Sequence, residues 1–408
     1  GEGLLVRHDE VPAPEGHEEA HRVLRPAEVP VVTYPYEWTF GQLQDAALLT
    51  LRVQRRALER GLWLKDASAF NVQLADGRPV LIDTLSFEAY PEGRPWVAYR
   101  QFCQHFLAPL ALMSRVDLRL GRLLGAHLDG VPLDLASALL PLRTRLQPGL
   151  LLNLHLHAWS QARLSGRAPA RRPVLPKRRL EALVEGLEAT VAGLRPAQGK
   201  TAWSGYSGAS SYSSRAYEEK QAIVGRFLEA VRPATVWDLG ANTGAFSRLA
   251  ADAGAFTVAL DADPLAADLH YRSLKGRGER RVVPLVVDLS NPTPSLGWDG
   301  RERPSLFERS RADMALALAL VHHLAIGHNF PLRALAAFLA RIAPHVAVEF
   351  VPKQDPQVQG MLASRADVFP DYTLEGFEAA FRERFSFVES HGLPGSDRRL
   401  FLLRRLDG

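Results

Sequence analysis

Short apolar runs and longer amphipathic stretches alternate through the second half of the chain. The apolar runs occupy residues 236–239, 256–261, 282–288, 313–320 and 345–350. Runs of this length predict buried strands, and the stretches between them predict helices. Strands that alternate with helices form a mostly parallel sheet with helices on its faces. Residues 201–408 are therefore predicted to form an α/β domain.

A glycine-containing turn follows the first of these strands. Residues 236–244 read VWDLGANTG, and the next strand ends in Asp261 about twenty residues later. Gly240 and Gly244 leave no Cβ where the backbone must approach a ligand, and the following helix offers free N–H groups at its start. An acid at the position of Asp261 can accept hydrogen bonds from both hydroxyls of a ribose. Turn and acid together predict a nucleoside-containing cofactor.

The residues around the turn favour one class of cofactor. The dinucleotide pattern G-x-G-x-x-G is not present, and Asp238 precedes the glycines. A carboxylate there repels a pyrophosphate but can hold an amine, so S-adenosylmethionine is expected rather than NAD. With these residues, the segment 201–408 resembles class I S-adenosylmethionine-dependent methyltransferases. Their first motif is D/E-x-G-x-G-x-G, and Asn242 replaces its middle glycine here.

This resemblance implies a Rossmann-like sheet of seven strands with a terminal antiparallel hairpin. A helix over 373–382 and strands over 385–391 and 398–404 match that tail. It also implies a set of cofactor-binding positions. The predicted set is Asp238, Gly240, Asn242, Gly244, Asp261 for the ribose, and Asp288 with Leu289 for the adenine.

Two adjacent histidines follow the fourth predicted strand. His322 and His323 lie at the carboxyl edge of the sheet, where substrates bind in open α/β folds. A histidine there can take a proton from the acceptor, and His323 is preferred slightly over His322 as the base. Together with His328 and Glu349 the pair could instead bind a metal. Neighbouring residues on a strand point in opposite directions, so we predict no metal site.

Missing motifs limit the methyl acceptor. No N/D-P-P-Y/F/W sequence follows the fourth strand, and the one cysteine, Cys103, is far from the cofactor motif. Exocyclic base amines and cysteine-dependent attack on pyrimidines are therefore disfavoured. An oxygen or nitrogen of a small molecule or glycan is expected as acceptor, with aromatic and hydroxyl residues over 203–214 as a candidate lid. The alternatives are RNA, or a silent protein that only binds its cofactor.

The first 160 residues carry a second constellation of polar residues. Asp66, Asn71 five residues later, and Asp83 after a short hairpin resemble the catalytic and metal-binding segments of protein-kinase-like and aminoglycoside-phosphotransferase-like folds. Residues 31–37 match a strand and hinge, and 42–60 a long helix. The resemblance implies an α+β domain like a kinase C-lobe, with Mg²⁺ and a nucleotide as possible ligands. No glycine-rich loop precedes a strand lysine, so a degenerate or structural module is expected.

A resemblance at family level covers nearly the whole chain. The segments LKDASAFNVQ, LIDTLSFE, AYRQFCQHFLAPLALM, DLGANTG and ALVHHLAIG are similar to those of bacterial NoeA-like, nodulation-associated methyltransferases. The resemblance implies methyl transfer in a bacterial cytoplasm and identifies no acceptor. Residue 1 is Gly rather than Met, and the first residues resemble the middle of a domain, which is typical of a truncated or cleaved chain.

Composition agrees with two folded domains. The chain has 408 residues, 47% of them hydrophobic and 23% charged, with one cysteine and a formal net charge of +4. These values predict two cores, a reducing compartment, no membrane partner and no demand for nucleic acid. Prolines and arginines cluster over 163–179, and His155 and His157 lie shortly before this cluster. We predict a kinase-like domain at 1–162, a basic linker with a helix at 163–200, and the methyltransferase domain at 201–408.

Overall fold

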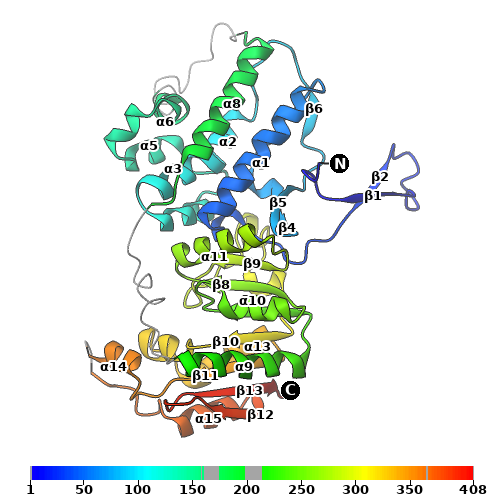
Figure 1. The fold of residues 1–408 in the computed structure, drawn as a ribbon. Coiled ribbons are helices and arrows are strands. Elements are labelled where there is room, and N and C mark those ends of the chain that lie inside the picture. The colour runs from blue at the N-terminus through cyan, green and yellow to red at the C-terminus, as the bar shows by residue number, and fades with distance from the viewer. Residues whose placement is uncertain (1, 158, 160–173, 198–213, 364–365, 408) are drawn as a thin grey trace. The chain divides into compact units, whose positions relative to one another are not determined.

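The computed structural model describes residues 2–157, 159, 174–197, 214–363 and 366–407. The chain divides into an N-terminal unit, Gly1–Gly199, and a C-terminal unit, Lys200–Gly408. Each unit has its own core and its own sheets (Figure 1). The candidate lid over 203–213 and the arginines at 163, 167, 171 and 172 lie outside the described residues.

The N-terminal unit combines helices with two-stranded antiparallel sheets. Its strands are β1 (His8–Val11), β2 (Val23–Pro26), β3 (Leu62–Leu64), β4 (Val72–Ala75), β5 (Arg78–Leu81) and β6 (Phe87–Ala89). Its α-helices are α1 (Phe40–Leu58), α2 (Tyr99–Phe102), α3 (Ala108–Arg115), α4 (Leu123–Ala126), α5 (Leu133–Leu139), α6 (Pro148–Leu150) and α8 (Lys177–Gly193). Shorter turns are the 3₁₀ segments η1 (Pro35–Glu37), η2 (Ala69–Asn71), η4 (Leu118–Arg122) and η5 (Leu142–Leu146), and the π segments η3 (Cys103–Leu107) and η6 (Leu151–His155).

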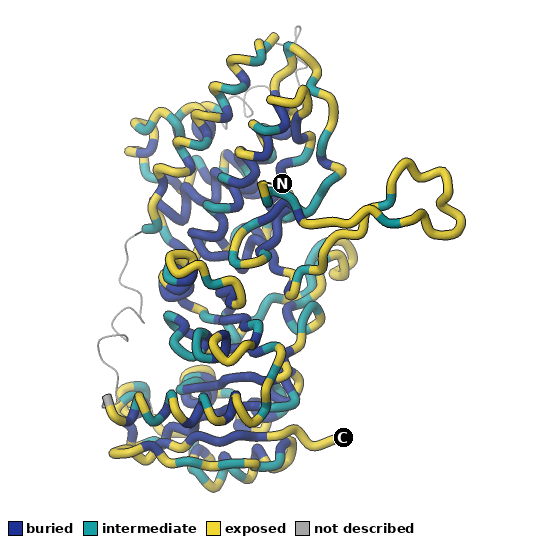
Figure 2. The backbone as a smooth tube through the Cα atoms, turned by 45° about the vertical axis from the view of Figure 1, so that its right-hand side comes forward, coloured by how far each residue is buried: buried dark blue, intermediate teal, exposed yellow. Residues whose placement is uncertain are grey.

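The long predicted helix is α1, which begins two residues earlier than predicted. Thr39 caps it: the Thr39 hydroxyl accepts from the Gln42 N–H at 3.2 Å, and Gln42 Oε1 accepts from the Thr39 N–H at 2.8 Å. This reciprocal cap satisfies N–H groups that a helix start leaves free. The strand predicted over 31–37 is not formed, because Pro35 starts η1 instead. The protruding β1–β2 hairpin is exposed along most of its length (Figure 2).

Helix α8 belongs to the N-terminal unit. It packs along α1, where Gln44 Nε2 donates to the carbonyls of Val191 at 2.8 Å and Leu194 at 3.1 Å. The apolar face of α8, with Leu180, Val184 and others, is buried. Helix α8 lies within 163–200, where a basic linker with a helix is predicted, and it packs onto the N-terminal unit.

The C-terminal unit is built on a sheet of seven strands. They are β7 (Thr235–Leu239), β8 (Phe256–Asp261), β9 (Val282–Val286), β10 (Met314–Ala317), β11 (His345–Phe350), β12 (Phe385–Gly392) and β13 (Arg399–Arg405). Their spatial order is β12-β13-β11-β10-β7-β8-β9. Strands β7 to β11 are parallel to one another, whereas β13 runs antiparallel to both β11 and β12. The predicted α/β sheet with a terminal antiparallel hairpin is confirmed.

Helices cover the sheet. They are α9 (Ser214–Val231), α10 (Ala245–Asp252), α11 (Pro264–Arg277), α12 (Leu306–Arg309), α13 (Leu332–Ile342), α14 (Pro356–Leu362) and α15 (Leu374–Arg382), with the 3₁₀ turn η7 (Trp298–Gly300) and the π segment η8 (His323–Gly327). Helices α9 and α10 lie on one side of the sheet (Figure 1), where Phe227 packs against Leu316 and Leu402 in one buried cluster. The chain order reverses between β7 and β10, so their carboxyl ends open a crevice there.

Candidate functional site

The turn after β7 bends the backbone sharply at the carboxyl end of the sheet. Gly240, Asn242 and Gly244 all have positive φ, at 77°, 50° and 77°. The N–H groups of Gly240 and Ala241 donate to the Leu260 carbonyl, and the Asn242 N–H donates to Asp261 Oδ2 at 2.7 Å. The turn is therefore tied to the end of β8, and helix α10 starts directly after it.

The two glycines of this turn are needed for different reasons. A Cβ on Gly240 would lie 3.5 Å from Leu320 Cδ1, which is ordinary contact. A Cβ on Gly244 would lie 1.9 Å from the ring of His270, a buried side chain of α11. Gly244 is also not among the residues that line the cavity described below. We predicted that it admits a ligand, but in the structure it makes room for His270 and supplies the left-handed start of α10.

Carboxylates from three successive strands meet at this edge. Asp238 near the end of β7 is 3% exposed, and its Oδ2 accepts from the Ser247 hydroxyl at 2.6 Å. Asp261 ends β8, and Asp288 follows β9, where its Oδ1 accepts from the N–H and hydroxyl of Ser290. Burial raises the pKa of Asp238 to about 6 and also raises the pKa of Asp261. The carboxylates were predicted from the sequence to lie together, and they do.

These carboxylates open on one cavity of about 510 Å³. That volume lies within the range of small-molecule sites. Its lining combines the turn, the ends of β8 to β10 and parts of α9, η8 and α14. The lining residues used below are Tyr217, Lys220, Asp238, Gly240, Asn242, Phe246, Asp261, Asp288, Leu289, His323, His328 and Gln357.

The two histidines differ in their access to the cavity. His323 begins η8 and lines the cavity, whereas His322 is completely buried and does not line it. Neither ring nitrogen of His322 has a hydrogen-bond partner in the described part of the chain. Burial, and then the neighbouring His328, lower the pKa of His323 to about 4, so its ring is neutral at pH 7. Burial also lowers the pKa of His322 well below its ordinary value. The geometry favours His323 over His322 for contact with a ligand.

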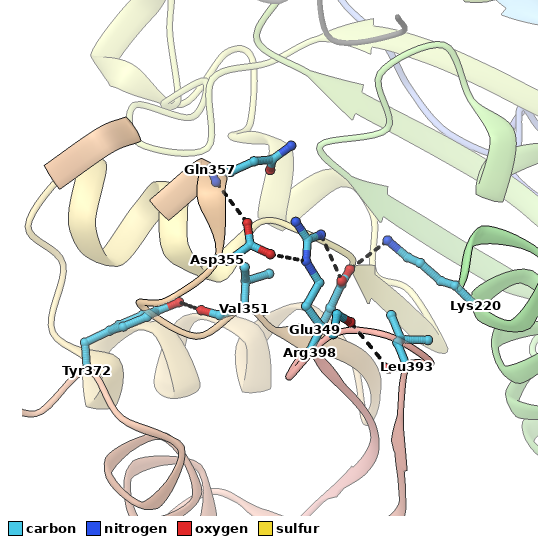
Figure 3. A network of polar contacts seen from close by, with 9 residues as sticks. Lys220, Glu349, Val351, Asp355, Gln357, Tyr372, Leu393 and Arg398 are labelled. Carbon is cyan, nitrogen blue, oxygen red and sulfur yellow. Dashed lines mark hydrogen bonds and ion pairs between the residues drawn. The ribbon is translucent and has the colours of Figure 1, made fainter. Parts of the chain in front are cut away.

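Four buried charged residues form a chain of ion pairs (Figure 3), and one of them, Lys220, lines the cavity. Lys220 Nζ on α9 donates to Glu349 Oε2 at 2.7 Å. Arg398 donates to Glu349 Oε1 at 3.4 Å and to Asp355 Oδ2 at 2.7 Å. The Gln357 N–H donates to Asp355 Oδ1, which fixes the start of α14. The signs alternate, so each buried charge has an opposite neighbour, as burial requires.

Sequence patterns did not reveal this chain, because its members are separated by up to 178 positions and follow no motif. Glu349 had been considered as a metal ligand, but the ion pairs with Lys220 and Arg398 engage it. Within the described residues, no group of three or more His, Cys, Asp or Glu side chains is placed to hold a metal ion.

In the N-terminal unit, Asn71 and Asp83 come close through the β4–β5 hairpin. Asn71 Nδ2 donates to the Ser86 hydroxyl at 3.4 Å, and that hydroxyl donates to Asp83 Oδ2 at 2.5 Å. Asp83 Oδ1 accepts from the Leu85 N–H, and Asp66 Oδ1 accepts from the Ser68 N–H. Each of Asp66 and Asp83 thus accepts a hydrogen bond from the backbone of the turn that it begins.

Comparisons with known proteins give one extensive similarity. The chain is 39% identical to nodulation protein NoeA of Rhizobium meliloti (strain 1021) over 394 residues, which is 94% of this chain and 82% of the relative. No protein-family model matches the chain.

Solved structures resemble about half of the chain. N-methyltransferase NodS from Bradyrhizobium japonicum WM9 matches at 13% identity and a TM-score of 0.37, over 48% of this chain and 99% of that one. Magnesium protoporphyrin IX methyltransferase (ChlM) from Synechocystis PCC 6803 with bound SAH matches at 16% identity and a TM-score of 0.36, over 47% of this chain and 84% of that one.

Proposed function

The chain belongs to the family of nodulation protein NoeA, and from this premise we propose that its C-terminal unit transfers the methyl group of S-adenosylmethionine to an oxygen or nitrogen acceptor. The observation that carries the proposal is the convergence of Asp238, Asp261 and Asp288 on one cavity at the carboxyl ends of successive parallel strands. A nucleoside with a charged amino acid end needs such a set of acceptors on one side of a crevice.

The nucleoside half of the cofactor is assigned to the turn and the next two strand ends. Asp261 uses one lone pair of each carboxylate oxygen for the N–H groups of Asn242 and Asp263, so each oxygen can still accept from a ribose hydroxyl. Asp288 and Leu289 line the cavity beyond β9, where an acceptor and an apolar side chain suit an adenine. Gly240 lets the backbone approach the ligand without a Cβ between them.

The amino acid half is assigned to the side of the cavity that carries opposite charges. Asp238 and Lys220 both line the cavity, and each favours the charged form of the other. A carboxylate can hold the ammonium group of the cofactor, and the Lys220 ammonium can hold its carboxylate. Burial lowers the pKa of Lys220, whereas its ion pair with Glu349 opposes that effect. Glu349 thus helps to keep Lys220 charged and in place.

The acceptor is assigned to the part of the cavity lined by His323, His328 and Gln357. The reaction breaks the bond between methyl carbon and sulfur and forms one between that carbon and the acceptor oxygen or nitrogen. The acceptor proton passes to His323, whose neutral ring can accept it as the acceptor loses electron density. Alignment of acceptor and methyl group contributes most of the rate in such a displacement.

We favour a small molecule or glycan as acceptor. The polar side chains at this end of the cavity can donate or accept hydrogen bonds, which suits hydroxyl and amine substituents. RNA is the second candidate, and the arginines over 163–179 are the feature that favours it.

For the N-terminal unit we propose a structural role rather than phosphate transfer. Asp66 and Asp83 each satisfy backbone N–H groups of their own turns, and Ser86 bridges Asn71 to Asp83. These contacts explain the three residues without Mg²⁺ or a nucleotide.

The first experiment is calorimetric titration of the full chain with S-adenosylhomocysteine and with 5′-methylthioadenosine, which lacks the amino acid end. We expect Asp261→Ala to weaken both ligands by roughly 100-fold, because two hydrogen bonds to a charged group are lost. Lys220→Gln should weaken only S-adenosylhomocysteine, by roughly 10-fold. If neither ligand binds the wild type, the proposed function fails. If Lys220→Gln affects both ligands equally, only the assignment of Lys220 fails.

A second experiment separates enzyme from silent binder. The chain is incubated with methyl-labelled S-adenosylmethionine and either a bacterial metabolite and glycan extract or total RNA. We expect label in the first pool, and a loss of about 100-fold or more in His323→Ala with S-adenosylhomocysteine affinity unchanged. Label in RNA would favour the second candidate. Cofactor binding with no label in either pool would favour a silent binding protein.

A further inference from the structure

Arg398 is the central cation of the buried chain of ion pairs, and it comes from the loop between β12 and β13 (Figure 3). Its side chain is 1% exposed, and it is not among the residues that line the cavity. The Leu393 N–H donates to the Arg398 carbonyl at 3.0 Å, which closes the loop. Two different nitrogens of the guanidinium bond two carboxylates, Nη1 that of Glu349 and Nε that of Asp355. Arg398 therefore joins two acids that belong to different elements.

The Glu349 branch of the chain ends at the amino acid half of the cavity. Glu349 on β11 is completely buried, and its Oε2 accepts from Lys220 Nζ at 2.7 Å. Lys220 lines the cavity, where its ammonium lies 4.9 Å from the centre of the Phe246 ring. A lysine ammonium is a point charge on a flexible stem, so its place depends on the groups that hold it. Arg398 thus fixes Lys220 through Glu349.

The Asp355 branch ends at the acceptor side of the cavity. Asp355 caps α14, where its Oδ1 accepts from the Gln357 N–H at 3.0 Å, while its Oδ2 accepts from Arg398 at 2.7 Å. Gln357 lines the cavity. Helix α14 also packs against η8, the segment that begins with His323. A helix this short is marginal by itself, so its cap and the group that holds the cap fix this wall.

Helix α11 shows what a cap provides without such an arginine. Both helices begin with Asp-Pro, at Asp263-Pro264 and at Asp355-Pro356. Asp263 accepts from two N–H groups of its own helix and takes no part in the charged chain. A helix start of this kind therefore needs no buried cation. The contact of Arg398 with the α14 cap does something more, because it connects this helix to Glu349.

Stability alone does not require these four buried charges. Taking charges out of water is costly, and well-packed apolar residues of similar volume are often as stable as a buried ion pair. Buried charges beside a cavity are typical of functional sites. Lys220 at one end of the chain and Gln357 at the other both line the cavity, whereas the three residues between them do not. That is the arrangement expected of residues that position others.

We propose that Arg398 is a positioning residue for methyl transfer. Through Glu349 it holds Lys220 in place for the cofactor carboxylate, and through Asp355 it holds α14 beside the acceptor. The inference rests on the proposed function of this cavity, and it adds that one residue outside the cavity fixes both walls. Acceptor, methyl carbon and sulfur must be aligned for the displacement, so a small shift of either wall slows the reaction.

The test uses Arg398→Lys in the full chain, because lysine keeps the charge but lacks the fork that holds two carboxylates. In calorimetric titrations we expect this variant to weaken S-adenosylhomocysteine by roughly three- to tenfold and to leave 5′-methylthioadenosine unchanged, since only the first ligand reaches Lys220. The double variant Arg398→Lys/Lys220→Gln should bind S-adenosylhomocysteine as Lys220→Gln does. Arg399→Lys is the matched control, since Arg399 is exposed on β13, and it should bind as the wild type does.

Amide hydrogen exchange tests the acceptor side of the cavity without an acceptor. In Arg398→Lys we expect α14 to exchange roughly tenfold faster, and α11 to exchange as in the wild type. Asp355→Asn removes the ion pair at α14 and leaves the Glu349 pair, so it should speed exchange in α14 with both ligand affinities unchanged. At saturating methyl-labelled S-adenosylmethionine, both variants should label the metabolite and glycan extract roughly tenfold more slowly than the wild type.

The outcomes separate this inference from the function on which it rests. A wild type that binds neither ligand would refute the proposed function. If the wild type binds both and Arg398→Lys weakens both equally, only the positioning role fails, because a general loss of structure does not distinguish the ligands. Unchanged exchange in α14, or a double variant much weaker than Lys220→Gln, would also overturn that role. Far-UV circular dichroism melts check that each variant is folded, and Asp355→Asn carries the test if Arg398→Lys is not.

Discussion

Sequence motifs suggest a binding role for carboxylates in both units, but the structure gives the two sets different surroundings. In the C-terminal unit, Asp238, Asp261 and Asp288 come from the ends of separate strands and share one cavity. In the N-terminal unit, Asp66 and Asp83 each accept from the N–H group two residues on, as Asp261 and Asp288 also do, but neither lines that cavity. Asp238 is almost completely buried, whereas Asp66 and Asp83 are partly exposed. Convergence from separate elements, rather than spacing along the chain, distinguishes a candidate site from a set of turns.

The cost of burial supports the same distinction. A buried carboxylate with a raised pKa destabilises the folded state at neutral pH, and such a cost is typical of functional sites. Asp238 bears that cost, and its pKa is raised to about 6. The turns of Asp66 and Asp83 are local contacts of the kind that stabilise loops.

The largest expected effect concerns Gly244, which ends the turn after β7 and starts α10. Gly244→Ala places a Cβ 1.9 Å from the His270 ring at a positive φ, and should cost more than about 4 kcal/mol of unfolding free energy. The matched change in the N-terminal unit is Gly61→Ala. Gly61 also has a positive φ, of 72°, but nothing lies within 4 Å of its Cβ position, so about 1 kcal/mol is expected. Urea denaturation of both variants measures the difference.

The double variant Gly244→Ala/His270→Ala separates overlap from backbone strain. Removal of the ring should restore part of the stability that Gly244→Ala loses, relative to His270→Ala alone. Equal losses of stability in Gly61→Ala and Gly244→Ala would mean that the His270 ring is not the reason why position 244 requires glycine.

The next effect concerns Asp238, where one substitution should raise stability and lower cofactor affinity. Asp238→Asn removes a buried charge, so it should raise the unfolding free energy at pH 7 by about 1 to 2 kcal/mol. The same change should weaken S-adenosylhomocysteine by roughly 10- to 100-fold, because the ammonium group loses its ion pair. Asp83→Asn is the matched change and should leave cofactor affinity as it is. A stability loss in Asp238→Asn together with unchanged affinity would remove Asp238 from the site.

A smaller effect is the pH dependence of stability. Burial lowers the pKa of His270 to about 3 and of His323 to about 4, compared with the ordinary value of 6.5. Below pH 6.5 the unfolded chain therefore binds protons at these two histidines that the folded chain does not, so they lower stability as the pH drops from about 6.5 towards 4. The raised pKa of Asp238 acts in the opposite direction below about pH 6. Urea midpoints across that range measure the loss. His270→Leu should flatten the slope, and an unchanged slope would show that His270 does not contribute.

The smallest expected effect concerns Mg²⁺ and ATP. Added together, they should move the thermal midpoint of the full chain by less than about 1 °C, because a ligand without a site does not stabilise the folded state. S-adenosylhomocysteine is the positive control in the same melts. A clear shift with Mg²⁺ and ATP that Asp83→Asn abolishes would make the N-terminal motif a binding site, and the comparison of the two units would no longer hold.

Local patterns in the sequence predict much of the C-terminal fold. The strands of the α/β sheet and the terminal hairpin were predicted from apolar runs and from the methyltransferase resemblance, and the structure has them. Asp263 and Pro264 are residues typical of a helix start, and they cap and begin α11. Patterns were weaker for the N-terminal unit, where Pro35 prevents the strand expected over 31–37.

The sequence by itself determined the strands of the C-terminal unit and the glycine turn after β7, because hydrophobic period, caps and glycines act over a few neighbouring residues. Only the tertiary structure decided that His323 rather than His322 reaches the cavity, that Gly244 makes room for His270, and that Lys220, Glu349, Arg398 and Asp355 form one buried chain. Each of these depends on residues far apart in sequence. Burial and charge pairing act through space, and no local pattern records them.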